Sequence, residues 1–322
     1  MPDAIAVSPL VRTLTTITIS ARDPESLQHF FCTGLGWRKV AQHALDEHIA
    51  AHWGIAPGSA GSQAITLAPA DTTRGQVRIV AGRERSRRRP IASRFAGIEM
   101  IVPRDLDALY EELRQLPGIT VLQPPIDTDW SEFGSNLHRA FILSAHGGTH
   151  LAFTMGLTEP AGRSFPTSNA RAGHVFELPL VTTRFDRARA FYVGVLGMQP
   201  VLESRFERGF WHRIWKLPEP TDVQLHILKG NAPGTGLGAI ELTGYPAEVI
   251  DDDTPDAWRF DGGACMITYD TTNIDAVFDA VSASRFAEIV GRPLPLSIWD
   301  ERRAFVFRGP DGERVEIVQA GL

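Results

Sequence analysis

Three glutamates stand at alternating positions of apolar strand-like segments in the second half of the chain. They are Glu177 in HVFELPL, Glu241 in AIELT and Glu316 in ERVEIV. Side chains in a strand point alternately to opposite faces, so each glutamate faces away from its apolar neighbours. The neighbours that define the apolar faces are Leu178, Leu180, Ile240, Leu242, Val315 and Ile317. Carboxylates that meet in one place can bind a hard cation, or share a proton and so supply a general base.

Further polar and aromatic side chains accompany these glutamates. In VQLHILK, Val223, Leu225 and Ile227 form one apolar face, which predicts that Gln224 and His226 face the same pocket as the glutamates. We expect His226 to take part in catalysis, and Gln224 and Arg314 to bind substrate. The segment FWHRIW predicts aromatic walls for a planar or largely apolar ligand, with ordinary core packing as the alternative. Its candidate substrate-binding residues are Trp211, His212 and Trp215.

An internal repeat shows which elements must position these residues. Residues 13–155 and 174–320 align at an offset of roughly 161 to 165. Each copy contains an alternating strand, an amphipathic helix and three further strands, and then repeats that order. The sequence therefore predicts an α+β protein of four βαβββ modules. We expect one two-module domain over 1–156, a linker over 157–172 and a second two-module domain over 173–322.

Two charged runs occupy equivalent positions in the two copies. AGRERSRRRP at 81–90 is basic, and AEVIDDDTPD at 247–256 is acidic. We interpret both as solvated loops. The alternative is that the two runs pair with each other, between the halves or between subunits.

Composition limits the classes of ligand. Hydrophobic residues make up 43% of the chain, and its formal charge is −6. This balance offers no basic surface for nucleic acid and no attraction to an anionic membrane, so we expect a small-molecule substrate. Cys32 and Cys265 lie in apolar segments without metal-ligand spacing, and the first residues carry no targeting signal. These features predict a cytoplasmic protein, monomeric or homodimeric.

The segments FYVGVLGM, GAIELT and RGPDGERVEIV together resemble the vicinal oxygen chelate superfamily, which contains glyoxalases, bleomycin-resistance proteins and extradiol dioxygenases. The resemblance covers nearly the whole chain. It implies that pairs of modules form cup-shaped half-barrels, whose inner faces hold a divalent metal that chelates two neighbouring substrate oxygens. Four modules then give two glyoxalase-like half-barrel domains.

The resemblance implies a metal site at Glu177, Glu241 and Glu316 in the second cup. Two departures from the family pattern are clear: Glu177 stands where a histidine is usual, and the partner position in the fourth module aligns with Ala264. His174 could replace Glu177 only if a bulge shifts the strand register, and we favour Glu177.

In the first half of the chain, the positions that align with the expected metal ligands hold other residue types. They are Thr16, Arg78, Ile98 and Ala152, and His150 shares the face of Ala152. Because Arg78 would repel a cation, we expect the first cup to be a structural partner or an anion-binding remnant.

An all-oxygen set of ligands favours Mg²⁺ or Mn²⁺ over iron or zinc, and a metal-free site is the alternative. Either version predicts proton abstraction by a glutamate, with Glu241, Glu316 and His226 as the catalytic residues of a lyase or isomerase. Two alternatives stay open. One is an extradiol-type dioxygenase, which needs two histidines beside a carboxylate. The other is a drug-binding protein without catalysis.

Overall fold

The structure is a computed structural model of the whole chain. It describes residues 9–55, 62–82, 91–92, 94–131, 137–145, 148–159, 165–231, 239–251, 260 and 262–321. Within this part, the side chains of five residues are not described. They are Ala92, Arg94, Phe210, Trp211 and Asp251.

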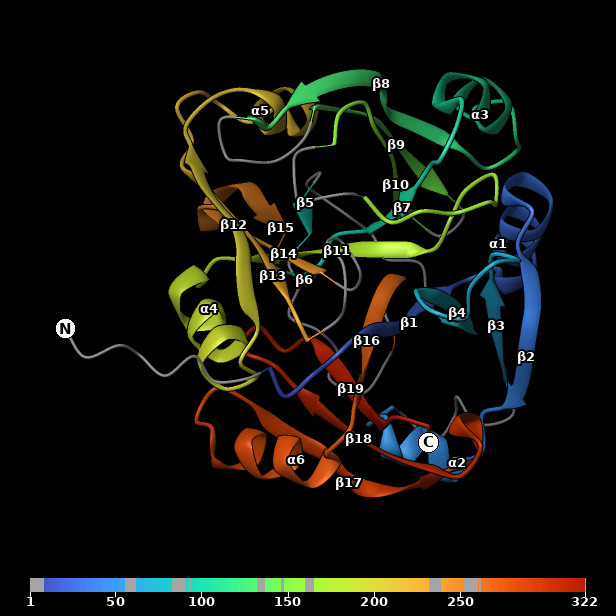
Figure 1. Cartoon of the computed structure of the whole chain (residues 1–322), viewed down its shortest axis with the longest axis vertical. Coiled ribbons are helices and arrows are strands. Elements are labelled where there is room, and N and C mark those ends of the chain that lie inside the picture. The colour runs from blue at the N-terminus through green and yellow to red at the C-terminus, as the bar shows by residue number, and fades with distance from the viewer. Residues whose placement is uncertain are drawn as a thin grey trace.

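Two large curved sheets form the molecule (Figure 1). The first contains, in spatial order, β17 (Glu288–Leu296), β18 (Arg302–Arg308), β19 (Arg314–Gln319), β16 (Gly263–Thr271), β1 (Leu14–Ala21), β4 (Gln76–Ala81), β3 (Gln63–Ala68) and β2 (Arg38–Ala44). The second contains β12 (Gln199–Phe206), β13 (Val223–Lys229), β14 (Ala239–Gly244), β11 (Val175–Thr182), β7 (Ile98–Ile101), β10 (Thr149–Gly156), β9 (Leu137–Ala145) and β8 (Thr120–Asp129), with β6 (Arg94–Phe95) also paired to β11.

Short helices connect the strands. They are α1 (Pro24–His29), which continues into the π-helical turn η1 (Phe30–Gly34), α2 (Glu47–His52), α3 (Leu106–Leu113), α4 (Phe185–Gly194), α5 (Phe210–Trp215), η5 (Ala247–Val249), α6 (Ile274–Ala283) and η6 (Ser297–Trp299). In α6, the Asn273 side chain caps the start by accepting the Ala276 N–H at 3.1 Å, and Ile274, Val277 and Val281 form the buried stripe. Local sequence thus sets both the start and the buried face of this helix.

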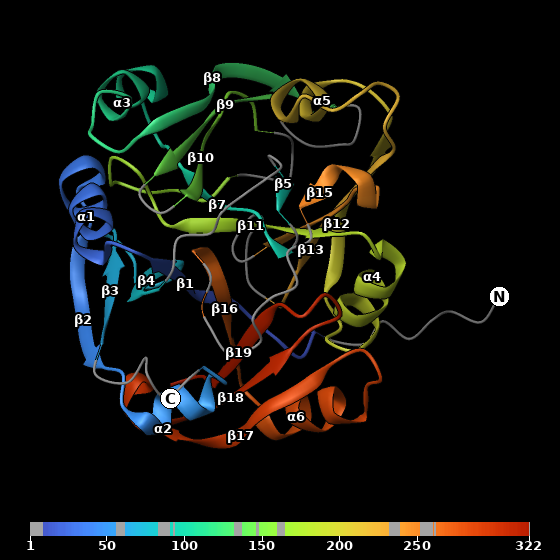
Figure 2. The ribbon, with the colours of Figure 1, turned by 180° about the vertical axis from the view of Figure 1, so that it is seen from behind.

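The expected α+β fold of βαβββ modules and two half-barrels is confirmed, but the modules pair differently from the expectation. The central pairing of the first sheet joins β1 of the first module to β16 of the fourth, and that of the second joins β7 to β11. Each sheet therefore contains one module from each half of the chain, as the colours of Figures 1 and 2 show. We call them the terminal half-barrel (modules one and four) and the central half-barrel (modules two and three).

Strand alternation builds one large core between the half-barrels. Ile17 and Ile79 of the terminal sheet and Leu178 and Leu242 of the central sheet are fully buried in the same apolar cluster, which also contains helix residues such as Phe191. Every second residue of these strands therefore faces the core, and the residues between them face the concave side. This alternation determines which side chains can form a site.

The chain just after the basic run lies beside part of the acidic run. β5 (Ile91–Ala92) and β15 (Ile250–Asp251) form a two-stranded parallel sheet. Most of the basic and acidic runs themselves, 83–90 and 252–256, lies outside the described residues. Whether their charges pair stays a prediction.

Among the helices of the described ranges, none has the length and apolar character needed to cross a membrane.

Candidate functional site

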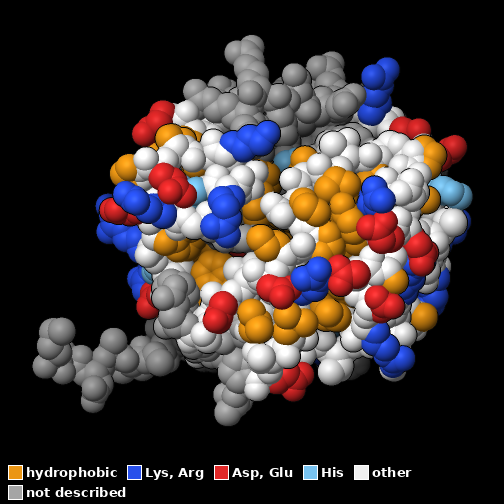
Figure 3. Space-filling model, turned by 90° about the horizontal axis from the view of Figure 1, so that it is seen from above, with side chains coloured by type: hydrophobic (Ala, Val, Ile, Leu, Met, Phe, Trp, Pro, Cys, Tyr) orange, Lys and Arg blue, Asp and Glu red, His pale blue; other side chains and the backbone are white. Residues whose placement is uncertain are grey.

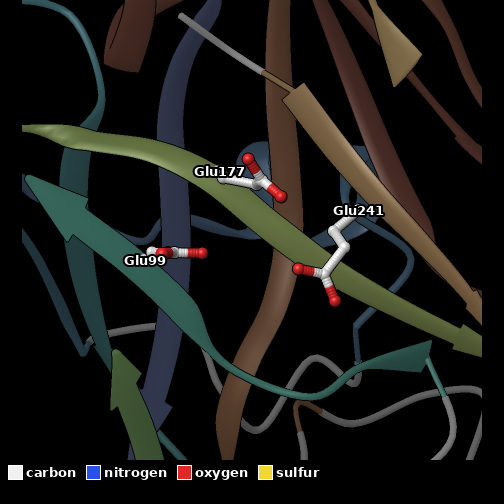
Figure 4. A group of neighbouring side chains, drawn as sticks. All are labelled: Glu99, Glu177 and Glu241. Atoms are coloured by element: carbon white, nitrogen blue, oxygen red, sulfur yellow. The ribbon is translucent and has the colours of Figure 1, made fainter. Parts of the chain in front are cut away.

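Three glutamates meet on the concave face of the central half-barrel. They come from three adjacent strands: Glu99 from β7, Glu177 from β11 and Glu241 from β14. Glu177 lies directly opposite Glu99 in the antiparallel pairing of β7 and β11. One carboxylate oxygen from each residue lies within 4.8 Å of the other two, and the side chains point toward a common space (Figure 4). This is an all-oxygen arrangement that a hard divalent cation can bind.

Burial raises the pKa of all three carboxyl groups, and repulsion by neighbouring carboxylates raises it further at Glu177 and Glu241. Burial is the main cause for each residue, and the charge of Glu99 adds to the effect on both Glu177 and Glu241. The pKa of Glu241 rises to about 7, and that of Glu177 rises well above its usual range. The cluster therefore holds protons near neutral pH unless a cation replaces them.

Hydroxyl groups and a shared proton orient the carboxylates. Thr243 donates to Oε1 of Glu241 at 3.0 Å, and the hydroxyl of Thr154 donates to Oε1 of Glu99. A side-chain hydrogen bond between Glu177 and Glu241 raises the pKa of Glu177 and lowers that of Glu241, so Glu177 is the donor. Glu241 is thus the member best able to accept a further proton at neutral pH.

Two cavities open on this cluster. The first measures about 740 Å³ together with the solvent at its mouth. Its lining comprises Glu99, Gln123, Trp130, His138, Ala140, Ile142, Ala152, Thr154, Phe165, Phe176, Glu177, Leu202, Leu225, Ile227 and Glu241. The second, about 540 Å³ by the same measure, shares Glu99, Ile142, Ala152 and Glu241 with the first. The carboxylates therefore lie between two spaces in one groove.

Glu316, which was expected in the same site, lies in the terminal half-barrel. Its Oε2 is 3.5 Å from Nη1 of Arg78, and its Oε1 accepts the Nε1–H of Trp53 at 2.9 Å. Thr268 also donates to it, at 2.8 Å. The parity of Glu316 was predicted correctly, but β19 belongs to the other sheet, so this carboxylate neutralises Arg78 and does not join the cluster.

Arg314 is also in the terminal half-barrel, so its expected placement in the same cup as Glu241 was wrong. Its Nη2 donates to the backbone oxygen of Gly54 at 3.2 Å, and its guanidinium lies 5.2 Å from the ring centre of Phe260. The reason is the same as for Glu316, because both residues are on β19.

His226 and Gln224 face away from the groove, so their expected placement was wrong. Nδ1 of His226 is 3.3 Å from Nε of Arg189 and 3.2 Å from Oε1 of Glu203, and its ring meets that of Phe185 edge to face. The partners Phe185 and Arg189 belong to α4. Leu225 and Ile227 line the cavity in place of the polar residues. The groove wall is apolar at β13, and His226 packs against α4.

The expected residues of the aromatic segment 210–215 do not all lie at the groove. Trp215 lines the second cavity and stacks on His150 with ring centres 5.9 Å apart and planes at 16°. His212 does not line either cavity, because its Nε2 lies 2.8 Å from the backbone oxygen of Thr221 in a buried contact. The side chain of Trp211 lies outside the described part of the chain.

The structure places Glu177, and not His174, in the cluster of glutamates. His174 is buried, and burial lowers its pKa to about 4; the nearby charges are those of Asp71 and Arg74, away from the carboxylates.

Sequence reasoning missed Glu99 because it assigned the equivalent position to Ile98. Ile98 and Met100 are both buried in the core, so the alternation in GIEMI was a usable signal that Glu99 faces the groove. Ala152, correctly expected to face inward, lines both cavities beside Glu99.

Comparison with known proteins supports the family assignment. Residues 171–317 match the model of the Glyoxalase/Bleomycin resistance protein/Dioxygenase superfamily, so the chain carries a domain of this superfamily. The matched stretch contains the third and fourth modules, which the structure places in different half-barrels.

Solved structures extend the likeness to the fold of the whole chain. Glyoxalase I from Zea mays shares 14% identity at a TM-score of 0.62, covering 95% of this chain and 92% of that protein. A candidate dioxygenase from Bacillus subtilis shares 14% identity at a TM-score of 0.60, covering 97% and 86%. At these identities the likeness shows the fold alone. A search of curated proteins gave no match.

Proposed function

We propose that the chain is an enzyme that binds a divalent cation, Mg²⁺ or Mn²⁺, at Glu99, Glu177 and Glu241 and removes a proton beside a carbonyl group of a small substrate. The observation that carries the proposal is the meeting of three carboxylates, two of them buried and one half-buried, between two cavities. Buried acids are costly when they are not paired, so their convergence in a groove favours a functional role. The reaction class is a lyase or isomerase.

The carboxylates fit such an ion. Three oxygen ligands come from three rigid adjacent strands, and Ala152 beside Glu99 offers no fourth ligand, which leaves room for substrate oxygens. When bound, the cation would polarise a substrate carbonyl and stabilise the negative charge that forms on its oxygen. Among the described residues, the cluster contains no histidine, which disfavours the two-histidine set of an extradiol dioxygenase.

Glu241 is the proposed base. Its pKa of about 7 makes it half ionised at neutral pH, where a general base is most effective. Thr243 holds one of its oxygens, and Glu177 donates to it. This part of the proposal does not require the cation, so proton abstraction by a metal-free site is retained as the second version.

A binding protein without catalysis is the competing function, and the apolar lining of the first cavity favours it. Trp130, Phe165 and Phe176 would hold a ligand in either case. The two functions differ in whether protons move at Glu241.

We further propose that the protein acts in the cytoplasm as a monomer or homodimer, with no nucleic acid or membrane partner.

Mn²⁺ binding to the full chain tests the metal site. We expect Glu241→Gln to weaken Mn²⁺ affinity by about a hundredfold, measured by calorimetry, because loss of even an outer-shell partner costs ten- to a hundredfold. Glu203→Gln, an exposed carboxylate away from the cluster, is the matched control. Equal Mn²⁺ affinity in wild type and Glu241→Gln would refute the ligand set.

Proton abstraction is tested with 2-hydroxyacetophenone in D₂O. We expect the protein to catalyse exchange of the protons beside the carbonyl, detected by NMR, and Glu241→Gln to abolish this catalysis while keeping ligand binding. Binding without exchange in the wild type, with and without Mn²⁺, would favour the binding protein over the enzyme.

A further inference from the structure

The two cavities occupy opposite ends of the same concave strands. On β10, His150 lines only the second cavity, Ala152 lines both and Thr154 lines only the first. On β11, Glu177 lines the first cavity, and Pro179 and Val181 line the second. Since residues two apart on a strand lie along one face, the groove runs along the strands with the carboxylates near its middle. A ligand whose oxygens meet the carboxylates therefore has space on both sides.

Aromatic side chains line both ends. In the first cavity, Phe165 meets Phe176 and His138 edge to face, with ring centres 5.7 and 6.1 Å apart. In the second cavity, Trp215 stacks on His150, and Tyr245 lies nearby. Flat apolar groups pack well against such walls. Each end therefore offers an aromatic wall against which an apolar group can pack.

His138 gives the first cavity a neutral polar contact. Burial lowers its pKa to about 4, so its ring is uncharged at neutral pH. Its buried Nδ1 has no hydrogen-bond partner among the described residues. An unpaired buried nitrogen is costly, and a hydroxyl, carbonyl or N–H of a ligand would satisfy it.

Charge restricts the ligand further. Neither cavity has a lysine or arginine in its described lining, and the only ionisable acids there are the three glutamates. The face seen in Figure 3 shows basic and acidic side chains interspersed with exposed apolar ones. A carboxylate or phosphate on the ligand would be desolvated beside negative groups with no cation of the protein to pair with it.

We propose that the substrate is an uncharged molecule with two apolar arms, one on each side of an oxygen-bearing group. This group lies at Glu99, Glu177 and Glu241, which is where this inference depends on the proposed function. One arm occupies the end formed by Phe165, Phe176 and His138, and the other occupies the end formed by Trp215, His150 and Tyr245. Molecules with one arm, or with an anionic group, bind more weakly.

Three probes test the proposal on the full chain by calorimetry, each without and with Mn²⁺. Benzoin is neutral and carries phenyl groups on both sides of a hydroxy ketone. 2-Hydroxyacetophenone has one phenyl group. Mandelate also has one, and it carries a carboxylate where benzoin has its phenyl ketone. We expect benzoin to bind about tenfold more tightly than 2-hydroxyacetophenone, since a well-packed ring contributes about that much, and mandelate to bind most weakly without Mn²⁺. Mandelate equal to benzoin without Mn²⁺, or no binding of benzoin in either condition, would overturn the proposal.

Variants at the two ends of the groove measure the contribution of each arm to binding. Phe165→Leu and Trp215→Leu should each lower benzoin affinity severalfold, and together they should erase its advantage over 2-hydroxyacetophenone. Gln123→Arg places a cation in the first cavity and should raise mandelate affinity at least tenfold, while the exposed Gln115→Arg should not. An unchanged benzoin affinity in both leucine variants would show that it binds elsewhere.

The outcome is distinguishable from failure of the proposed function. Suppose that the protein neither binds Mn²⁺ nor catalyses proton exchange, but still binds benzoin more tightly than mandelate. The groove is then a binding site for neutral ligands with two apolar arms, without the proposed chemistry. If exchange occurs but mandelate binds best, the chemistry stands and the inference about the substrate is wrong.

Discussion

The two half-barrels share one architecture but fill their concave faces differently. In the terminal half-barrel, Trp53, Ile298 and Trp299 pack against strand residues such as Val80 and Val306 in a closed apolar cluster. In the central half-barrel, the same side of the sheet has two cavities. The segments around α2 and η6 therefore plug one cup, and the other stays hollow.

The charges in the two cups follow from this difference. In the plugged cup, Glu316 is fully buried and is neutralised by Arg78, whose guanidinium lies 4.4 Å from the ring centre of Trp299 and 5.4 Å from that of Trp53. In the hollow cup, three acids face one another without a basic partner among the described lining residues. A buried ion pair can complete a core, whereas three acids that converge in a groove need protons or a cation. This difference fits a structural role for the terminal cup and the proposed chemistry for the central cup.

Breaking the ion pair should have the largest effect. Arg78→Met leaves Glu316 buried without its cation, and we expect the free energy of unfolding to fall by about 3–5 kcal/mol, measured by urea denaturation. The double variant Arg78→Met with Glu316→Gln should recover most of this loss, because no unpaired charge remains. A loss of Mn²⁺ binding in the folded double variant would contradict the separation of the two cups.

The acid cluster should make stability depend on pH in the opposite sense from an ordinary ion pair. The pKa of Glu241 is about 7 in the folded chain and about 4.5 when unfolded, so the folded state keeps a proton that the unfolded state releases. The contribution of Glu241 to stability is therefore greatest below about pH 4.5, and it is lost as the pH rises to about 7.

From the size of this shift we expect a loss on the order of 3 kcal/mol without metal. Urea denaturation between pH 5 and 8 measures the slope, which should flatten in Glu241→Gln and persist in Glu203→Gln. Because a cation competes with protons, Mn²⁺ should raise the melting temperature more at pH 8 than at pH 6. A parallel slope in wild type and Glu241→Gln would remove Glu241 as the titrating group.

The indole contact of Glu316 should have a smaller effect. Trp53→Phe removes the 2.9 Å hydrogen bond to Glu316, and we expect a loss of about 2 kcal/mol, as is usual for a hydrogen bond to a charged group. Trp37→Phe is the matched control, because Trp37 donates at 2.9 Å to the neutral backbone oxygen of Ala172 and should cost about 1 kcal/mol. Equal losses in urea denaturation would argue against a charged Glu316.

The smallest effect is expected at Thr243. Thr243→Val removes the hydroxyl that donates to Glu241 at 3.0 Å and helps to keep its pKa from rising further. We expect a stability change of about 1 kcal/mol or less and a higher pH midpoint for proton exchange on 2-hydroxyacetophenone. Thr243→Ser keeps the hydroxyl and should retain the wild-type midpoint. A lower midpoint in Thr243→Val would contradict the role of this hydrogen bond.

Local patterns in the sequence determined much of the fold. The alternation around Glu177, Glu241 and Glu316 fixed the face of each side chain, because apolar neighbours at every second position must be buried. The repeat likewise predicted four βαβββ modules, and Trp215 was correctly expected beside the groove. On β13, the alternation pattern predicted the wrong face for the groove. Both faces of VQLHILK are at least partly buried, and Arg189 of α4 gives His226 a polar partner on the face away from the groove.

Only the tertiary structure decided which modules share a sheet. All four modules present a similar apolar face, so alternation cannot distinguish pairing of the first module with the second from its pairing with the fourth. The contacts of β7 with β11 and of β1 with β16 make that choice. They bring Glu99 to Glu177 and Glu241, and they carry Glu316 to Arg78. The sequence determined which way each carboxylate points, and long-range strand pairing determined which carboxylates meet.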